Sequence, residues 1–264
     1  MKLETLNKTI FENIHHSSGK FTKHFHDTYT IGLTHDGVFK SRHEKKVVFS
    51  YKNSSKIINP GEIHAGDSNS WKYTNFYPSI ELISEIYEQI FLEKKIPIFT
   101  EHIINDIQLY KLLLNFFLSI YNNEDKMLIE TNMISALSYL IKNYAHSTKE
   151  YNLSFNNKEI ITNSILYIKD SIDSNISLDD LAVNSNLSKY HFLRVFKNHT
   201  GITPHQYILI QKIEKSKDLI LKGMNLSEAA YNLGFADQSH LIRNFKKIYG
   251  YTPNNFKQNS NFIL

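Results

Sequence analysis

The pattern of apolar and polar positions divides the chain into two parts with different periods. Between about residues 15 and 75, apolar and polar residues alternate in short runs such as Tyr29–Leu33 and Lys46–Tyr51. Asn59–Glu62 is a turn signal, and Gly37 is expected to mark another turn. Short strands with turns at this rhythm predict a small antiparallel β-barrel.

From Phe76 to about His146 the apolar residues recur at helical spacing and form two stripes. The stripes comprise Ile107, Tyr110, Leu114, Phe117 and Tyr121, and Met133, Ile134, Leu137, Leu140, Ile141 and Tyr144. Residues 147–158 are polar and poorly periodic, which is typical of a linker. We therefore expect a first domain over residues 1–146, a linker over 147–158 and a second domain over 159–264.

The second domain contains an internal repeat. At an offset of 49, residues of one copy match those of the other: His191 and His240, Arg194 and Arg243, Phe196 and Phe245, Lys197 and Lys246. Upstream, Leu178–Ala182 corresponds to Leu226–Ala230 at an offset of 48. The difference of one residue falls between the two helices of each copy, where a turn can absorb it. The repeat predicts a duplicated helical unit.

Each copy is predicted to be a helix-turn-helix unit. Ser188 and Asp237 suit the N-cap of the second helix of each copy. Between the copies, Pro204 sits in the first turn of a longer helix that ends near Lys222. Such a helix of about 18 residues is about 27 Å long. This length can place two recognition helices in successive major grooves, which are roughly 34 Å apart.

The polar faces of the two second helices carry side chains that suit the major groove. They comprise Lys189, Tyr190 and Arg194 in the first copy, and Gln238, Ser239, His240 and Arg243 in the second. Arginine pairs with guanine, glutamine with adenine, and hydroxyls with either bases or phosphates. The alternative is that both arginines form surface salt bridges and that at least one of the repeated histidines, His191 and His240, packs or caps.

Charge is concentrated in the second domain. Residues 160–264 hold 12 basic and 8 acidic side chains, and from Ser188 onward the count is 11 to 4, whereas residues 1–159 hold 18 of each. A basic domain beside a neutral one is typical of phosphate binding, although a solvated lysine-rich surface would look the same. The absence of cysteine excludes disulfides, thiolate zinc sites and cysteine nucleophiles. With neither a signal-peptide core nor a membrane span in the sequence, we expect a cytoplasmic protein that does not associate with membranes.

On these residues, the segment from about 164 to 257 resembles the DNA-binding domain of the AraC/XylS family of bacterial regulators, most closely over Ala229–Pro253. The resemblance implies double-stranded DNA and RNA polymerase as partners, and a homodimer through helices within residues 106–146. Two positions depart from the family pattern. Lys212 stands where arginine is usual, and Leu193 occupies a groove-side position that is more often polar, where it touches a thymine methyl group or simply packs.

His24-Phe-His26 and Pro60–His64 resemble the two halves of a cupin motif, and AraC-type regulators often carry a cupin-like first domain. The fold class implied is α+β, with a cupin-like antiparallel barrel and following helices before an all-α DNA-binding domain. In metal-binding cupins two such histidines converge with a third. We expect His24, His26 and His64 to line an effector pocket. They are also the candidate ligands if a metal binds, but the usual carboxylate is missing, so we expect no metal and no cofactor.

These features together predict a sequence-specific transcription regulator that responds to a small-molecule effector of unknown identity and is not an enzyme. One alternative is a cupin enzyme with a catalytic metal, which stoichiometric transition metal in the purified chain would favour. Another is a nonspecific nucleoid-type binder, against which the mixed polar groove faces argue. Four further histidines, His15, His16, His35 and His43, are expected at the surface or in loops.

Overall fold

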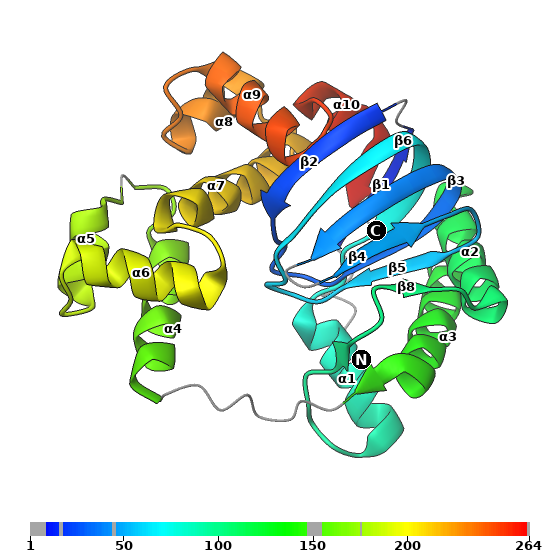
Figure 1. The fold of residues 1–264 in the computed structure, drawn as a ribbon. Coiled ribbons are helices and arrows are strands. Elements are labelled where there is room, and N and C mark those ends of the chain that lie inside the picture. The colour runs from blue at the N-terminus through cyan, green and yellow to red at the C-terminus, as the bar shows by residue number, and fades with distance from the viewer. Residues whose placement is uncertain (1–8, 16–17, 44–45, 147–154, 175, 263–264) are drawn as a thin grey trace. The chain divides into compact units, whose positions relative to one another are not determined.

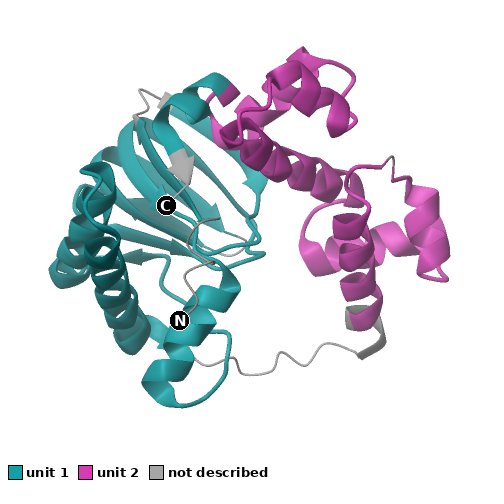
Figure 2. Cartoon of the chain, turned by 180° about the vertical axis from the view of Figure 1, so that it is seen from behind, with its two compact units in different colours: residues 1–149, 254–264 teal, residues 150–253 magenta. Residues whose placement is uncertain are grey.

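The computed structural model describes residues 9–15, 18–43, 46–146, 155–174 and 176–262. The chain forms two compact units, one of residues 1–149 with 254–264 and one of residues 150–253 (Figure 2). The first is an antiparallel sheet with helices and the second is entirely helical (Figure 1). The predicted α+β class is therefore confirmed. The domain limits predicted from the sequence stay predictions.

The sheet of the first unit has the strand order β10-β1-β6-β3-β5-β8, with β2 paired to β6 and β4 paired to β3. Its strands are β1 (Ile10–His15), β2 (Ser18–His24), β3 (Thr30–His43), β4 (Val47–Ser50), β5 (Ser55–Ile58), β6 (His64–Phe76), β8 (Ile103–Ile104) and β10 (Ser260–Phe262). Two short strands, β7 (Ile98–Phe99) and β9 (Ala145–His146), form a separate pair. The long strands β3 and β6 lie at the centre and carry most of the pairing.

The predicted turn at Gly37 is wrong, because the residue lies inside strand β3. The pairing of β3 with β6 shifts register between Asp36 and Val38, which makes Gly37 part of a β-bulge. Its φ of 73° is in the left-handed region, and a Cβ atom there would overlap the backbone of Ser70. A glycine in an alternating pattern therefore marked an irregularity within a strand and not its end.

Three helices pack against one face of the sheet: α1 (Ile80–Phe91), α2 (Ile107–Tyr121) and α3 (Lys126–Tyr144). Each begins at a side-chain N-cap, which is Ser79, Asp106 or Asp125. They bury the core against the sheet residues Phe11, Ile31, Leu33, Ile57 and Phe76. Of the two predicted apolar stripes, Tyr110, Phe117, Met133, Leu137, Leu140 and Ile141 are buried, whereas Ile107, Tyr121 and Ile134 are exposed.

The second unit contains α4 (Phe155–Asp170), α5 (Leu178–Asn184), α6 (Lys189–Thr200), α7 (Pro204–Leu221), α8 (Leu226–Asn232) and α9 (Gln238–Tyr249). Residues 147–154 of the predicted linker lie outside the described residues, and α4 takes in residues 155–158. Helix α10 (Pro253–Asn259) follows α9 and leads into strand β10. This last strand pairs with β1, with Ile10 opposite Phe262, a pairing to which no sequence pattern pointed.

Among the described residues, no helix is both long enough and apolar enough to cross a lipid bilayer.

Candidate nucleic-acid interface and sensor site

The two helix-turn-helix units are built from the same local interactions. Helices α5 and α8 are related by an offset of 48, and α6 and α9 by 49, so the extra residue lies in the turn as predicted. Ser188 Oγ accepts a hydrogen bond from the His191 amide at 3.3 Å, and Asp237 Oδ1 accepts one from the His240 amide at 2.6 Å. A left-handed glycine ends both second helices, at Gly201 and at Gly250.

The turns differ, but the buried faces correspond. The left-handed residue of the turn is Asn186, with φ 52°, in the first unit and Gly234, with φ 67°, in the second. The side chains that hold each helix pair together are buried: Leu181, Ala182, Phe192, Val195 and Phe196 in one unit, and Ala229, Ala230, Leu241, Phe245 and Ile248 in the other. Each unit is therefore a packed helix pair with one polar face left to solvent.

Helix α7 joins the two helix-turn-helix units and packs on both, since it contacts α6 of the first and α8 and α9 of the second. Its Lys217 is 1% exposed, and the ammonium lies 4.8 Å from the centre of the Tyr249 ring in α9. A capping box between Thr203 and Gln206 fixes its beginning, with Pro204 in the first turn, as predicted. Buried contacts along one continuous helix favour a fixed spacing between the two units.

Arg194 and Arg243 stand out on the polar faces. Both are exposed, and neither has a hydrogen bond or an ion pair with any of the described residues. The salt-bridge alternative weighed from the sequence thus has no partner in the described part of the chain. Two guanidinium groups at matching positions of matching helices are available for an external partner.

The remaining predicted groove residues are engaged to different degrees. Lys189 forms an ion pair with Asp179 of α5, and Gln238 accepts a hydrogen bond from Ser227 Oγ at 2.8 Å. His240 packs against the Phe235 ring, with the ring centres 5.4 Å apart, so part of its role is packing. Ser239 is exposed and Leu193 is half-buried, while the side chain of Tyr190 lies outside the described residues.

In the sheet-containing unit of residues 1–149 and 254–264, the three predicted sensor histidines come together. His24 at the end of β2 pairs across the sheet with His64 at the start of β6, and His26 follows β2. All three are buried, and their ligand-capable nitrogens lie within 4.8 Å of one another. Burial, followed by the proximity of His24 and His26, holds the pKa of His64 well below its usual value. His64 is therefore neutral at physiological pH.

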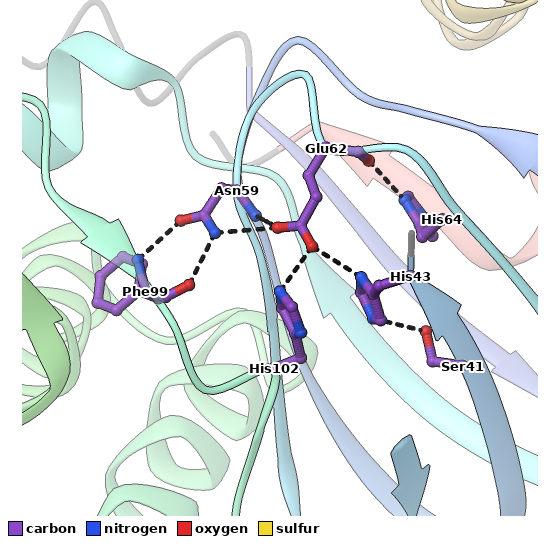
Figure 3. A network of polar contacts seen from close by, with 7 residues as sticks. All are labelled: Ser41, His43, Asn59, Glu62, His64, Phe99 and His102. Carbon is purple, nitrogen blue, oxygen red and sulfur yellow. Dashed lines mark hydrogen bonds and ion pairs between the residues drawn. The ribbon is translucent and has the colours of Figure 1, made fainter. Parts of the chain in front are cut away.

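A second polar cluster adjoins the first (Figure 3). It includes Glu62, which the sequence indicated only as part of a turn, and His102, to which no sequence pattern pointed. Glu62 Oε1 accepts hydrogen bonds from His43 Nδ1 at 2.7 Å and from His102 Nε2 at 2.6 Å. Asn59 Nδ2 donates to the other oxygen of Glu62 at 3.0 Å and to the Phe99 carbonyl at 2.8 Å. This network ties β3, the turn before β6 and the β7–β8 segment together.

The expectation of surface or loop positions is wrong for His35 and His43, whereas the His15 side chain and the whole of His16 lie outside the described residues. The His43 side chain is 5% exposed and bonded to Glu62, and His35 Nε2 lies 2.7 Å from Thr74 Oγ1 within the sheet. Both residues belong to β3, whose length the sequence pattern underestimated because Gly37 was interpreted as a turn.

A row of polar residues crosses the sheet on the face away from the helix-packed core. Lys56 of β5 lies opposite Gly32 of β3, Gly32 opposite Asn75 of β6, and Asn75 opposite Glu12 of β1. The Lys56 ammonium lies 4.8 to 5.6 Å from the ring centres of Phe39, Trp71 and Tyr73. Burial lowers the pKa of Lys56 to about 8, against the opposing effect of the Glu12 charge.

Comparison with known proteins finds two matching families along the chain. Residues 13–137 match the AraC-like ligand binding domain, and residues 181–259 match a helix-turn-helix domain. An uncharacterized HTH-type transcriptional regulator of Bacillus subtilis, YbfI, is 28% identical over 233 residues, which cover 84% of this chain and 82% of that protein. The probable transcriptional regulator LumQ of Photobacterium leiognathi is 28% identical over 58% of this chain and 60% of its own length.

Solved structures share the whole fold. An apo variant of ToxT from Vibrio cholerae matches with a TM-score of 0.67 and 14% identity, over 97% of this chain and 96% of ToxT. ToxT with a bound unsaturated fatty acid matches with a TM-score of 0.64 and 15% identity, over 98% of this chain and 96% of ToxT. At these identities the likeness establishes the two-unit fold alone.

Proposed function

Because the chain belongs to the AraC type of transcriptional regulators, with a ligand-binding domain before its helix-turn-helix domain, we propose that helices α6 and α9 read its operator. The proposed DNA contacts are Lys189, Tyr190, Leu193, Arg194, Gln238, Ser239, His240 and Arg243. The observation that carries this proposal is the pair of exposed guanidinium groups, Arg194 and Arg243, at matching positions of two duplicated helices.

The contacts divide into base readers and positioning groups. Arg194 and Arg243, without partners among the described residues, are assigned to guanine edges, where each bidentate pair contributes about 1–3 kcal/mol of discrimination. Gln238 is assigned to adenine, which requires it to exchange its bond with Ser227 for one to the base. Lys189, held by Asp179, is assigned to a phosphate, and half-buried Leu193 to a thymine methyl group.

One chain supplies both recognition helices, α6 and α9. Helix α7 has 18 residues, so it is about 27 Å long, and it packs on both units. This length, together with the offsets of the packed recognition helices, is compatible with grooves one helical turn apart. We therefore assign a bipartite operator to a single chain.

The sheet-containing unit is assigned to the binding of a small-molecule effector, with His24, His26 and His64 lining the effector pocket. Their convergence in the interior of the unit and the ligand-bound form of ToxT, a protein of this fold, support the assignment. An effector alters DNA occupancy only if it binds one arrangement of the protein more tightly than another. The chain acts in this proposal as a regulator that contacts RNA polymerase and not as an enzyme.

A homodimer through the helices within residues 106–146 completes the proposal. Several apolar side chains of α2 and α3 are exposed, most of them near the turn between the helices: Leu118, Tyr121, Met127, Leu128 and Ile134. Such side chains suit the centre of an interface. The oligomeric state of the purified chain, measured by light scattering, tests this part.

The experiment that tests the proposal is a gel shift with DNA from upstream of the neighbouring genes, at low salt, with and without candidate effectors. We expect a complex that unrelated competitor DNA removes only at large excess. Competition by unrelated DNA at equal mass would mark a nonspecific binder, and no complex under any condition would refute the regulator.

A further inference from the structure

Lys56 is a buried cation to which the described residues offer no hydrogen-bond acceptor. It is 6% exposed, and neither a hydrogen bond nor an ion pair joins its ammonium to any of them. Its neighbours Phe39, Trp71 and Tyr73 form a continuous stack, with successive ring centres 4.0 and 3.9 Å apart. Ring faces attract the positive charge but do not replace the water that its three N–H groups lose on burial. Such an ammonium favours an anionic partner that the described residues do not supply.

An acceptor without a partner lies in the same row across the sheet. In the row Lys56–Gly32–Asn75–Glu12, each residue is on the next strand, roughly 4.8 Å from the one before. Asn75 Oδ1 is buried and accepts no hydrogen bond from the described residues, while Asn75 Nδ2 donates to Tyr77 Oη at 3.1 Å. A Cβ atom at Gly32 would overlap Asn75 Oδ1, so this oxygen lies over the glycine, on the side of Asn75 that faces Lys56.

The two ends of the row carry opposite charges. Glu12 is the acidic residue whose charge acts on Lys56, and its carboxylate accepts a hydrogen bond from Tyr77 Oη at 2.7 Å. A simple anion beside Lys56 would be repelled by Glu12, and a dianion more strongly. A zwitterion that points its carboxylate toward Lys56 and its ammonium toward Glu12 meets an opposite charge at each end.

We propose that the effector is a small amino acid, whose carboxylate pairs with Lys56 and whose amino group donates to Asn75 Oδ1, toward the charge of Glu12. Both bonds are charge-assisted, and together they satisfy the two groups that have no partner. Both anchors are buried, which limits the ligand to a small molecule. The ring centres of His26 and Tyr77 lie 5.3 Å apart, so the sensor histidines border the same site. The inference rests on the proposed function, because it takes the sheet-containing unit as the place where the effector binds.

Lys217 shows that burial of a lysine beside an aromatic ring is not sufficient for such a site. It is 1% exposed, and its ammonium lies 4.8 Å from the centre of the Tyr249 ring. The carboxylate of Glu214, one helical turn away, lies 3.9 Å from this ammonium. The chain itself therefore supplies the counter-charge of Lys217, and this lysine does not need an external anion.

The test uses the full-length chain and the fluorescence of Trp71, the only tryptophan, whose ring centre lies 4.8 Å from the Lys56 ammonium. Each of the standard proteinogenic amino acids is titrated to millimolar concentration, with calorimetry as a second readout. We expect saturable binding of at least one of them. Its amide, which lacks the carboxylate, and its deaminated acid, which lacks the amino group, should each bind about 10–100-fold more weakly.

Variants assign each end of the ligand to its anchor. Lys56→Met should weaken binding of the amino acid about 10–100-fold and remove its advantage over the amide, because the group that distinguishes the two is gone. Asn75→Leu should remove the advantage over the deaminated acid in the same way. Lys52→Met, at an exposed position between β4 and β5, removes the same charge as Lys56→Met and should bind like the wild type. Circular dichroism checks that each variant folds, and the comparison of analogues on the wild-type protein decides if one does not.

The outcomes separate this inference from the proposed function. Absence of binding by every amino acid, equal binding of amino acid and amide by the wild type, or an equal loss of all three ligands in Lys56→Met would overturn the amino-acid site. Operator binding in a gel shift by a protein that binds no amino acid refutes the site and leaves the regulator intact. Amino-acid binding at Lys56 without any operator complex refutes the regulator and leaves the site.

Discussion

His102 Nε2 lies 2.6 Å from Glu62 Oε1, and this contact fastens the segment between β7 and β8 to the turn that precedes β6. Glu62 accepts a second bond at the same oxygen from His43, and its backbone carbonyl accepts from His64. Glu62 thereby connects the sensor residue His64, through its backbone carbonyl, to β3 and the β7–β8 segment, through its carboxylate. Burial alone would raise the pKa of Glu62, but the hydrogen bonds from His102 and His43 outweigh it and hold the pKa below its usual value.

Glu62→Gln should lower the free energy of unfolding by about 1–3 kcal/mol, because it removes the charge to which both imidazoles donate. Since the folded pKa lies below the unfolded value of 4.5, the stability from this carboxylate is present above pH 4.5 and is lost as pH falls below it. Urea unfolding between pH 3 and 7 measures both effects. Glu88→Gln, at an exposed position of α1, should change stability by less than about 0.5 kcal/mol.

Because of Lys56, the free energy of unfolding of the sheet-containing unit should rise with pH in alkaline solution. Its folded pKa of about 8 is below the unfolded 10.5, so the unfolded state holds more protons between these values and stability increases with pH across that window. Relative to Lys56→Met, the wild-type protein should gain about 3 kcal/mol from pH 8 to 10.5. Because both proteins keep their tyrosines, the difference isolates the lysine, and a difference that stays flat would mean that the ammonium is not desolvated.

Gly32→Ala and Gly61→Ala should both destabilise the protein, but for different physical reasons. A Cβ atom at Gly32 would overlap Asn75 Oδ1 and lie 2.9 Å from the Thr74 carbonyl oxygen, whereas at Gly61 it meets nothing within 4 Å. Gly32→Ala should therefore cost about 1–3 kcal/mol through overpacking. Gly61→Ala should cost about 1–2 kcal/mol through its positive φ alone. Thermal unfolding compares the two, and a Gly32→Ala protein as stable as the wild type would contradict the close strand packing.

Arg243→Ala should weaken operator binding by about 1–3 kcal/mol and relax the preference at one base pair. Arg194→Ala should do the same at a different base pair, because the two helices are copies of one unit. Lys52→Ala, at an exposed position between β4 and β5, removes the same charge and is the control. Binding to a library of single-base operator variants gives the measurement. If either arginine variant kept the wild-type preference at every base pair, that arginine would not be a base contact.

The helical repeat was predictable because its information is local. Caps, turn residues and apolar spacing recur within each copy, so Ser188, Asp237 and the one-residue difference in the turn could all be assigned without any distant contact. The predicted start of the long helix at Pro204 rests on the same kind of signal. Local rules of this kind set helix limits in most proteins.

The features that were missed depend on contacts between distant segments. Glu62 and His102 are 40 positions apart, and the β5–β8 pairing and the Asn59–Phe99 hydrogen bonds bring them together. His43 could not be placed while Gly37 was interpreted as a turn, because the correct strand continues through a bulge. Pairing of β10 with β1 joins the two ends of the chain, and a three-residue strand has no periodicity of its own. The convergence of His24 and His26 with the distant His64 was different, because a sequence motif indicated it.

Mapping the base contacts on a bound operator most directly tests whether the two duplicated helices, α6 and α9, both contact bases. With the purified full-length chain, missing-base interference should reveal two groups of contacts whose centres lie about 10–10.5 base pairs apart. Arg194→Ala should erase contacts in one group and Arg243→Ala contacts in the other. A single group of contacts, or loss of the same contacts in both variants, would contradict the reading of DNA by two copies of one helical unit.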